Sequence, residues 1–582
     1  MKTRLYNNEI GLKNVDKDVT VIGWVSRIRK FGSITFVDLR DTSGIVQIVF
    51  NENLSKNIKL SREDLISVEG RVNKRLEANP KIKSGEVEII ASKYEVVSSS
   101  LTPPFIIENE TDALEDTRLE YRYLDLRRPQ LHDIIKLRSS AMQIIRNYLV
   151  KKSFVEIDTP LLCLSTPEGA RDYIVPSRVN PGNFYALPQS PQIFKQLCMI
   201  GGFERYFQIA HCLRDEDLRA DRQPEFMQVD IETSFLSQKE LLTLIEGLAK
   251  EVFKKTIGYE IKTPLRRISY HDAMKLYGSD KPDTRINLII NDFKYQKGIA
   301  FEGFKLNKQV RYLRFPHTSD YFSRKVQDSL NLEAKKFGLP NIICLKLNNG
   351  VLEGGFTKFL SPELQSKIIV DEKLQDGDTL IIAYGQKYER VSQFLGSLRL
   401  SLGRELDLVD NKEYDMLWVV DFPLFEYSET EKRYVSSHHP FTRPLDKHLK
   451  YLKTNPKKVL SSAYDFVING YEAGGGSMRI YDRDIQRQIF EVLGLSDEEV
   501  GKKFGWFLQA FEYGTPPHGG LAFGMDRLTM LLAKTDNIRD VIAFPKNLKA
   551  VCPMTKAPGT VSDEQLKELS IKLDLSNEGG EN

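Results

Sequence analysis

The chain has 582 residues, of which 41% are hydrophobic and 28% charged, and this composition excludes a disordered protein. Its length suits about three or four domains. The 83 basic and 80 acidic residues leave a net charge of only +3, which excludes a globally basic nucleic-acid coat protein but allows a local basic surface. Five scattered cysteines without a CxxC pair favour a reducing compartment and no structural zinc. The polar N-terminus and the lack of an apolar run of about 18 residues predict a cytoplasmic protein with no signal peptide and no membrane span.

Residues 1–105 predict a separate small β-domain. Five short β-rich runs are separated by Gly, Asp, Asn and Ser, a spacing that is typical of a small closed barrel. An OB-fold is therefore the leading candidate. The five runs are Val19–Val25, Ser33–Leu39, Ile45–Phe50, Leu65–Val72 and Glu86–Ile90.

Basic and aromatic side chains are interleaved with these runs. Arg27 and Arg29 precede Phe31, and Phe36 lies in the next run. Positive charge for phosphates and rings for bases are what a binder of single-stranded nucleic acid needs. The rings could equally belong to the barrel core, because the alternation that puts Phe36 in phase with Asp38 does not separate the two interpretations.

A connector separates this domain from the rest of the chain. Residues 98–104 have the Ser and Pro content of a linker, and we assign the charged segment 106–130 to a hinge. From Leu131 to Lys152 apolar residues recur at steps of three and four, which predicts an amphipathic helix. Such a helix suits either the core or a dimer seam.

The stretch from Phe203 to Glu232 predicts two strands joined by a charged loop. One face of the second strand is apolar, and the other carries Phe226, Gln228, Asp230 and Glu232. A solvated hairpin with salt bridges is the ordinary interpretation. The hydrogen-bonding groups gathered on one face, with Arg214 at the end of the first strand, favour a binding surface instead. The Pro-punctuated loops 166–173 and 187–195 precede the hairpin and are expected to border it.

The region from about 288 to 410 differs from the segments on either side. It alternates strand and helix patterns without clusters of chemically active residues, and we assign 288–410 to an inserted α+β domain.

Dense signals return after the insertion. The Asn469-Gly470 pair predicts a two-residue hairpin turn, which would set Val467 opposite Glu472. Asp465 would then share a sheet face with Glu472. Two carboxylates on one face suit a Mg²⁺ site, since Mg²⁺ is usually held by one or two carboxylates and substrate phosphates.

Two glycine-rich segments carry arginines. Gly474–Gly476 allows close approach to the backbone, and Arg479 offers a planar fork to a carboxylate. Arg527 falls in the first turn of a predicted helix, where the backbone already favours anions, so it indicates phosphate binding. Met-Asp in place of Lys-Ser/Thr after Gly524 excludes a P-loop.

Taken together, these groups suit metal-assisted phosphoryl or nucleotidyl transfer. No Ser/His/Asp or Cys/His arrangement supports covalent catalysis. The adjacent pair His438 and His439, by itself, indicates only a surface pair.

The order of these motifs resembles class II aminoacyl-tRNA synthetases. The three signature motifs match a helix ending at Pro160, FERYFQIAHCLRDEDLRADRQPEF and GLAFGMDRL. The runs QSPQIFKQ, YGSDKPDTR, HHPF, NGYEAGGGSMR and TDNIRDVIAFPKN resemble the bacterial-type aspartyl-tRNA synthetase family along nearly the whole chain. The resemblance implies an α+β multidomain protein with an anticodon-binding OB-fold at 1–105. It also implies an antiparallel-sheet catalytic domain split between 131–287 and 411–582, a GAD-like domain at 288–410, and a homodimer formed through the helix from Leu131.

The resemblance also implies roles for individual residues. Arg214 would hold the α-phosphate of ATP and Arg527 the γ-phosphate, while Phe226 would stack on adenine. The ATP set is Arg214, Asp215, Glu216, Gln223, Phe226, Glu472, Gly524, Met525, Asp526 and Arg527, with Arg214 and Arg527 catalytic and with Asp465 and Glu472 binding Mg²⁺. The aspartate set is Glu168, Ser190, Gln192, Lys195, Arg214, Asp230, His438, His439 and Arg479. The anticodon set is Arg27, Arg29, Phe31, Phe36, Gln47 and Glu88, and this role favours the base-stacking interpretation of Phe36.

The implied activity is that of an aspartate–tRNA ligase. It would convert L-aspartate and ATP to aspartyl-adenylate and pyrophosphate, then transfer the aspartyl group to the 3′ end of tRNA(Asp). Three alternatives stay open: a synthetase for asparagine or lysine, a ligase that does not use tRNA, and a binding module. A further alternative is a non-discriminating enzyme that also charges tRNA(Asn). Such members tend to have His before the glycine at position 32, so Phe31 favours the discriminating form.

Overall fold

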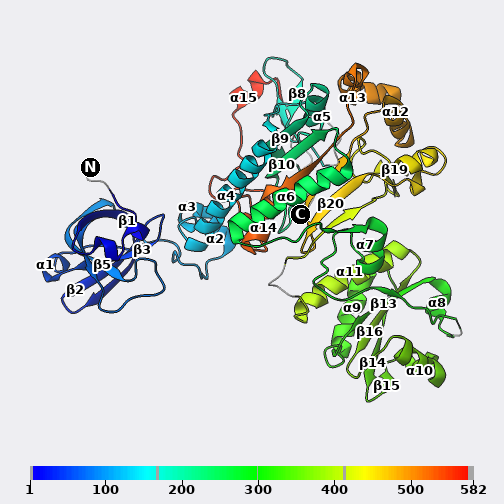
Figure 1. Ribbon diagram of the computed structural model, residues 1–582, viewed down its shortest axis with the longest axis horizontal. Coiled ribbons are helices and arrows are strands. Elements are labelled where there is room, and N and C mark those ends of the chain that lie inside the picture. The colour runs from blue at the N-terminus through cyan, green and yellow to red at the C-terminus, as the bar shows by residue number, and fades with distance from the viewer. Residues whose placement is uncertain (1–3, 166–169, 298, 410–413, 575–582) are drawn as a thin grey trace. The chain divides into compact units, whose positions relative to one another are not determined.

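The computed structural model describes residues 4–165, 170–297, 299–409 and 414–574. Two compact units make up the chain, one formed by Met1–Ile135 with Ile542–Gly559 and the other by Lys136–Val541 with Thr560–Asn582. The two units are described separately below, and Figure 1 labels their helices and strands.

The first unit contains a closed five-stranded barrel with the strand order β1-β2-β3-β5-β4. Alternate residues point into the barrel, so that Val21, Val25, Val37 and Leu39 are fully buried. This barrel confirms the predicted OB-fold. Its strands are β1 (Asp18–Phe31), β2 (Ile34–Arg40), β3 (Ile45–Phe50), β4 (Leu65–Lys74) and β5 (Val87–Ser98), with the short helix α1 (Glu52–Ser55) after β3.

The segment predicted as a hinge contains two short helices, α2 (Glu115–Glu120) and α3 (Arg122–Asp125). The buried Arg122 guanidinium pairs with Asp125 at 2.7 Å and donates hydrogen bonds to the carbonyl oxygens of Ile542 and Ala543. This contact explains why a segment from the far end of the chain belongs to the first unit, which the sequence did not indicate.

The second unit is built on an eight-stranded sheet with the order β11-β17-β20-β21-β22-β10-β9-β6. The strands are antiparallel, except that the edge strands β11 and β6 run parallel to their neighbours. The sheet confirms the antiparallel catalytic fold implied by the resemblance. Its strands are β6 (Val155–Glu156), β9 (Arg205–Leu213), β10 (Glu225–Ser234), β11 (Arg266–Ser269), β17 (Met416–Val420), β20 (Ala463–Ile468), β21 (Tyr471–Met478) and β22 (His518–Gly524).

Helices α4 (Pro129–Lys151), α6 (Gln238–Ile257) and α14 (Met525–Ala533) contribute to one large core with the sheet, and α6 lies across the strands in Figure 1. Ala141, Ile145 and Leu149 of α4 are buried in that core, which fulfils the core role predicted for the helix from Leu131. The remaining elements around this sheet are α5 (Gln192–Ile200), α7 (Tyr270–Tyr277), α12 (Arg483–Val492), α13 (Asp497–Ala510), α15 (Asp563–Glu568) and the two-stranded pairs β7 (Ile174–Pro176) with β8 (Phe184–Ala186) and β18 (Phe425–Ser428) with β19 (Arg433–Ser436).

The predicted hairpin is formed by β9 and β10, and its alternation is as expected. Val229 and Ile231 of β10 are fully buried in the core with the α4 and α6 side chains. Gln228, Asp230 and Glu232 take the opposite parity, on the face where the candidate site lies.

The region predicted as an insertion forms its own five-stranded sheet, with the order β12-β13-β16-β14-β15. Two hydrophobic clusters pack on it. Its elements are β12 (Asn291–Asp292), α8 (Glu302–Leu306), β13 (Gln309–Phe315), α9 (Arg324–Lys336), β14 (Ile342–Asn348), β15 (Val351–Glu353), α10 (Pro362–Asp371), β16 (Thr379–Gly385) and α11 (Tyr388–Glu405).

Candidate active site

Two adjoining cavities lie over the polar face of the large sheet. One has a volume of about 240 Å³ and is lined by most of the predicted ATP residues. The other, of about 390 Å³, is lined by the predicted aspartate residues that the structure describes. Both cavities are lined by Arg214, Glu216, Gln228, Glu472 and Ala522. Ligands bound in the two cavities would therefore share these contact residues.

Arg214 follows the end of β9 and lies where the cavities meet. Its guanidinium carbon is 5.0 Å from the centre of the Phe226 ring, and its Nε is buried without a hydrogen-bond partner among the described residues. A buried guanidinium N–H with no partner is suited to an anionic ligand. Gln223 is buried at the same cavity, and Glu216 pairs with Arg222 at 3.0 Å.

Arg527 reaches the first cavity from the opening turn of α14. It donates to the carbonyl oxygen of Glu472 at 2.7 Å and lies 3.3 Å from Asp221, while its Nε is buried and has no hydrogen-bond partner in the described structure. Asp526 anchors the turn, because its carboxylate accepts hydrogen bonds from the backbone N–H of Met227 at 2.8 Å and from Arg138.

Three other predicted ATP residues have different surroundings. Gly524 lines the cavity, whereas the Met525 side chain is fully buried in the hydrophobic core. Asp215 forms a backbone bridge with Arg171, and it is absent from the described residues that line the two cavities.

The Asn469-Gly470 turn joins β20 to β21 as predicted. Both residues have positive φ, +52° and +80°, and Val467 is paired with Glu472. The register shifts between Phe466 and Val467, so Asp465 pairs with Gly475. A Cβ on Gly475 would lie 2.8 Å from Asp465 Oδ1 and 3.0 Å from Glu472 Oε1, which shows that the two carboxylates converge over this glycine.

The electrostatics of this carboxylate pair suit a cation. Burial, and then the charge of Asp465, raise the pKa of Glu472 to about 7. Asp465 Oδ1 is buried without a hydrogen-bond partner among the described residues, although His438 Nε2 lies 3.8 Å away. No larger group of three or more His, Cys, Asp or Glu side chains suited to a metal occurs in the described ranges. Two carboxylates with open coordination fit Mg²⁺ shared with substrate phosphates better than a closed protein cage.

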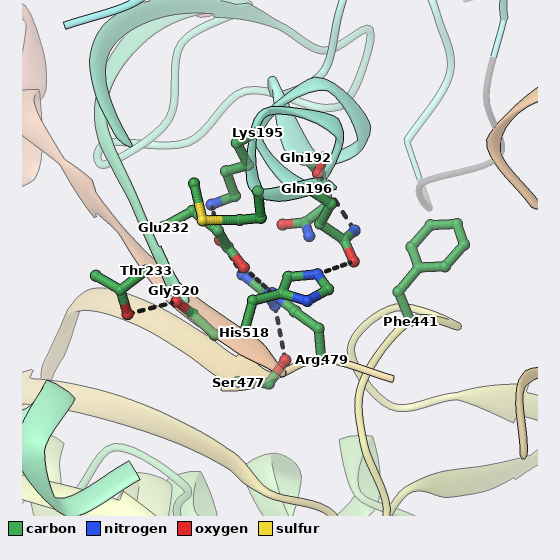
Figure 2. A network of polar contacts seen from close by, with 12 residues as sticks. Gln192, Lys195, Gln196, Glu232, Thr233, Phe441, Ser477, Arg479, His518 and Gly520 are labelled. Carbon is green, nitrogen blue, oxygen red and sulfur yellow. Dashed lines mark hydrogen bonds and ion pairs between the residues drawn. The ribbon is translucent and has the colours of Figure 1, made fainter. Parts of the chain in front are cut away.

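The floor of the second cavity is a buried network of two cations and two carboxylates, most of which Figure 2 shows. Arg479 binds Glu232 through two parallel contacts of 2.9 and 3.1 Å. Lys195 Nζ lies 2.9 Å from Asp230 and 3.4 Å from Glu232. Burial by itself would raise the pKa of Glu232, but the charges of Arg479 and Lys195 outweigh it and lower that pKa. The Glu232 carboxylate is therefore ionised before any substrate arrives.

The second oxygen of Asp230, Oδ2, is buried and has no hydrogen-bond partner among the described residues, and the same is true of Gln192 Nε2. Both residues line the cavity. A donor and an acceptor without partners, on residues that line the same cavity as Arg479 and Lys195, suit a small zwitterion that carries an extra carboxylate.

The two histidines line the same cavity, and their pKa values shift in opposite directions. Burial, followed by the charge of Arg479, lowers the pKa of His439 well below its usual value, and its Nε2 lies 2.7 Å from Arg479. Burial also opposes protonation of His438, but the interaction with Asp465 is stronger and raises its pKa. Ser190 lines the cavity and accepts a hydrogen bond from the backbone N–H of Gln192, whereas Glu168 lies outside the described residues.

Several residues of the site were missing from the predicted sets. Glu232 was placed on the polar face by alternation, but nothing in the sequence pairs it with Arg479, which is 247 positions away. Ser477 Oγ accepts a hydrogen bond of 2.7 Å from Arg479 Nη1, and Asp221 contacts Arg527. Ser477 lies near the end of β21, two positions before Arg479, and this spacing is the local signal that could have found it.

The predicted anticodon residues lie on the outer face of the barrel in the first unit. Arg29 Nη2 contacts Asp38 at 2.7 Å and Gln47 at 3.2 Å, and Gln47 donates to Glu88 at 2.7 Å. Phe36 is half-buried on this face, opposite in parity to the buried Val37, so it is not a core residue. Arg27 is exposed, and Phe31 is 79% exposed.

Comparisons with known proteins support these assignments of fold and family. Residues 114–548 match the model for class II tRNA synthetases (D, K and N), and residues 19–97 match that for OB-fold nucleic-acid-binding domains. An "Aspartate--tRNA(Asp/Asn) ligase" of Caldanaerobacter subterraneus is 48% identical, with 97% of this chain and 98% of the relative covered. An "Aspartate--tRNA ligase" of Lysinibacillus sphaericus is also 48% identical, over 98% and 99% of the two chains.

The crystal structure of asparaginyl-tRNA synthetase from Pyrococcus horikoshii with asparaginyl-adenylate matches with a TM-score of 0.59 and 20% identity, covering 94% of this chain and 98% of that one. At this identity the similarity supports a shared fold and nothing more. In the described residues, no helix is both long and apolar enough to cross a membrane. The resemblance inferred from the motifs is confirmed by the matching model and by relatives that align from end to end, and the chain belongs to the class II tRNA synthetases.

Proposed function

We propose that this protein is an aspartate–tRNA ligase that activates L-aspartate with ATP and charges tRNA(Asp). One observation carries the proposal: buried polar atoms without partners in the described structure belong to residues that line the two cavities. They are Arg214 Nε and Arg527 Nε in the nucleotide cavity, and Gln192 Nε2, Asp230 Oδ2, His438 Nδ1 and Asp465 Oδ1 in the amino-acid cavity. Buried polar groups without partners are costly, which supports a role in binding substrates.

The first cavity suits ATP. The Phe226 ring offers a stacking surface for the base, and Arg214 and Arg527 offer guanidinium groups to the α- and γ-phosphates. Asp465 and Glu472 would hold Mg²⁺, which would neutralise phosphate charge in the complex. Gly475 leaves the space that the two carboxylates need.

The second cavity suits aspartate. Arg479 and Lys195 would attract its side-chain carboxylate, while Asp230 Oδ2 would accept from its α-ammonium group. Arg214 lines both cavities and would bring the α-carboxylate toward the α-phosphate. A carboxylate oxygen then attacks the α-phosphorus, the bond to the pyrophosphate oxygen breaks, and aspartyl-adenylate forms. Positioning and charge neutralisation supply this step without a protein nucleophile.

In the second step, the 3′-terminal ribose hydroxyl of the tRNA attacks the aspartyl carbonyl and AMP leaves. We propose that the barrel face with Phe31, Phe36 and Arg27 binds the anticodon. The half-buried Phe36 ring and the largely exposed Phe31 ring, on a face that also carries arginines, are suited to stacking on single-stranded bases.

A screen of amino acids in ATP–pyrophosphate exchange tests the proposal. We expect exchange with L-aspartate and none with asparagine or lysine, because the proposed contacts of Arg479 and Lys195 with the substrate side chain require a carboxylate there. Exchange with lysine or asparagine alone would assign a different substrate. An absence of exchange with every amino acid would leave only the binding-module alternative. Deletion of residues 1–105 tests the alternative of a ligase that does not use tRNA. Such a ligase would keep its full reaction without the barrel.

The relatives carry both names, with tRNA(Asp) alone and with tRNA(Asp/Asn). We propose the discriminating form on the basis of Phe31. Aminoacylation of purified tRNA(Asp) and tRNA(Asn) decides the question, and comparable charging of both would overturn this choice.

We also propose a cytoplasmic homodimer. The support for a dimer is a group of exposed apolar side chains on the segment after α4, with Val155 at 47%, Leu161 at 52% and Leu162 at 54% exposure. Sedimentation equilibrium tests it, and a monomer at micromolar concentration would contradict it.

A further inference from the structure

Helix α5 carries Gln192 and Lys195, which both line the amino-acid cavity. At its N-terminal end the backbone N–H of Gln192 donates a 3.3 Å hydrogen bond to Ser190, and the N-cap residue, Pro191, has no side-chain group to cap the helix. A helix of nine residues without such a cap depends on tertiary contacts for its position. Those contacts therefore set where Lys195 meets the substrate.

One of these contacts is a buried hydrogen-bonded chain that joins α5 to the start of β22. His518 Nδ1 lies 2.8 Å from the carbonyl oxygen of Pro516, and its Nε2 lies 3.2 Å from Gln196 Oε1. Gln196 Nε2 in turn donates to the carbonyl oxygen of Gln192 at 3.3 Å. His518 is 1% exposed and Gln196 is fully buried, and Figure 2 shows the imidazole between Gln196 and Arg479.

This hydrogen-bonded chain takes no direct part in the proposed chemistry. Neither His518 nor Gln196 is among the described residues that line either cavity. Burial, which outweighs the opposing charge of Glu232, lowers the pKa of His518, so the ring is neutral. Both neighbours of the ring, the carbonyl oxygen of Pro516 and Gln196 Oε1, are acceptors, and a neutral ring has one N–H to offer them. The hydrogen bond to α5 therefore requires the tautomer with its hydrogen on Nε2, which donates to Gln196 Oε1.

We propose that His518 and Gln196 are positioning residues that fix α5, and with it Lys195 and Gln192, and so set the affinity for the amino-acid substrate. The inference rests on the proposed function. It also predicts a selective effect, because none of the described residues that line the nucleotide cavity comes from α5. Loss of the hydrogen bonds between His518 and α5 should weaken aspartate binding and leave ATP binding unchanged.

The test compares two substitutions of the same residue in the full-length protein. His518→Gln keeps an amide near the ring Nε2 position and retains the bond to Gln196, while His518→Asn reaches only the Nδ1 position and loses it. In aspartate-dependent ATP–pyrophosphate exchange, we expect His518→Asn to raise the KM for aspartate by about tenfold or more, since small misplacements of binding groups are costly. The KM for ATP should stay within about twofold, and His518→Gln should stay close to the wild type.

Gln196→Met provides a second, independent variant of nearly equal volume. It should match His518→Asn, and the double variant should be no worse than either single one, because both remove the same chain. If His518→Asn lacks a cooperative thermal unfolding transition, Gln196→Met decides by the same criterion.

Three outcomes would overturn the inference. They are equal increases in the KM values for ATP and aspartate, an unchanged KM for aspartate in the variants without the chain, and identical behaviour of His518→Asn and His518→Gln. A wild-type protein that shows no exchange with aspartate would instead overturn the proposed function.

Discussion

The amino-acid cavity and the outer face of the barrel both carry arginines, but they hold them in different ways. Arg479 is 1% exposed, and its guanidinium group contacts Glu232, Ser477 and His439 within hydrogen-bond distance. Arg27 on the barrel is exposed, and Phe31 beside it is 79% exposed. The first site is organised before its ligand arrives, whereas the exposed Arg27 and Phe31 side chains of the second must become ordered on binding.

This difference has consequences for energetics. Removing one member of a buried, paired cluster leaves an uncompensated charge and affects both stability and chemistry. Removing an exposed side chain affects only the ligand it meets. Substitutions in the two regions should therefore separate the activation step from tRNA binding.

The largest effect is expected for Arg214→Ala in the activation site. Loss of this guanidinium, which lines both cavities, should lower ATP–pyrophosphate exchange by about 10³-fold, as for other groups that stabilise transition-state charge. Arg219→Ala is the matched control, because Arg219 is exposed in the same loop and does not appear among the described lining residues. Near-normal exchange in Arg214→Ala would remove this arginine from the mechanism.

Gly475→Ala should have the next largest effect. The added methyl group would lie within 3.0 Å of both carboxylates and would force them apart, which should weaken metal-dependent exchange by about 100-fold. Gly505→Ala is the control, since a Cβ there meets nothing within 4 Å. An unchanged metal requirement in Gly475→Ala would show that the carboxylates do not act together.

A smaller effect is expected from pH. The pKa of Glu472 is raised to about 7, so protons compete with the cation below that value. The Mg²⁺ concentration for half-maximal exchange should rise about tenfold from pH 8 to pH 6 because Glu472 becomes protonated. Glu472→Gln should bind the metal weakly at both pH values and lose the part of the pH dependence that comes from Glu472. The protonation of ATP affects both proteins equally, so the difference between them reports on Glu472. A pH-independent requirement in the wild type would contradict the raised pKa.

The smallest effect is expected on the barrel. Phe31→Ala should raise the KM for tRNA about fivefold, equivalent to about 1 kcal/mol of lost stacking, and leave exchange and thermal stability unchanged. Leu76→Ala, at another exposed apolar position of the barrel, should change none of these quantities. A change in exchange for Phe31→Ala would break the proposed separation of the two regions.

Local geometry in this protein follows from patterns of neighbouring residues. Turn chemistry at Asn469-Gly470 predicted the pairing of Val467 with Glu472, and alternation in β10 predicted which face of the hairpin is polar. Both are properties of neighbouring residues, whose backbone preferences act whatever the rest of the chain does. The predicted domain boundaries and the roles of the individual site residues stay predictions.

Which charged side chains pair with each other depends on the tertiary structure and could not be predicted from the sequence. The pairing of Arg479 with Glu232 depends on β21 and β10 flanking β22, an order that no local pattern contains. The barrel likewise decided that Phe36 lies on the outer face, and Arg122 joins Ile542–Gly559 to the first unit. The physical reason is that such contacts join segments far apart along the chain, and strand order and closure determine them rather than periodicity.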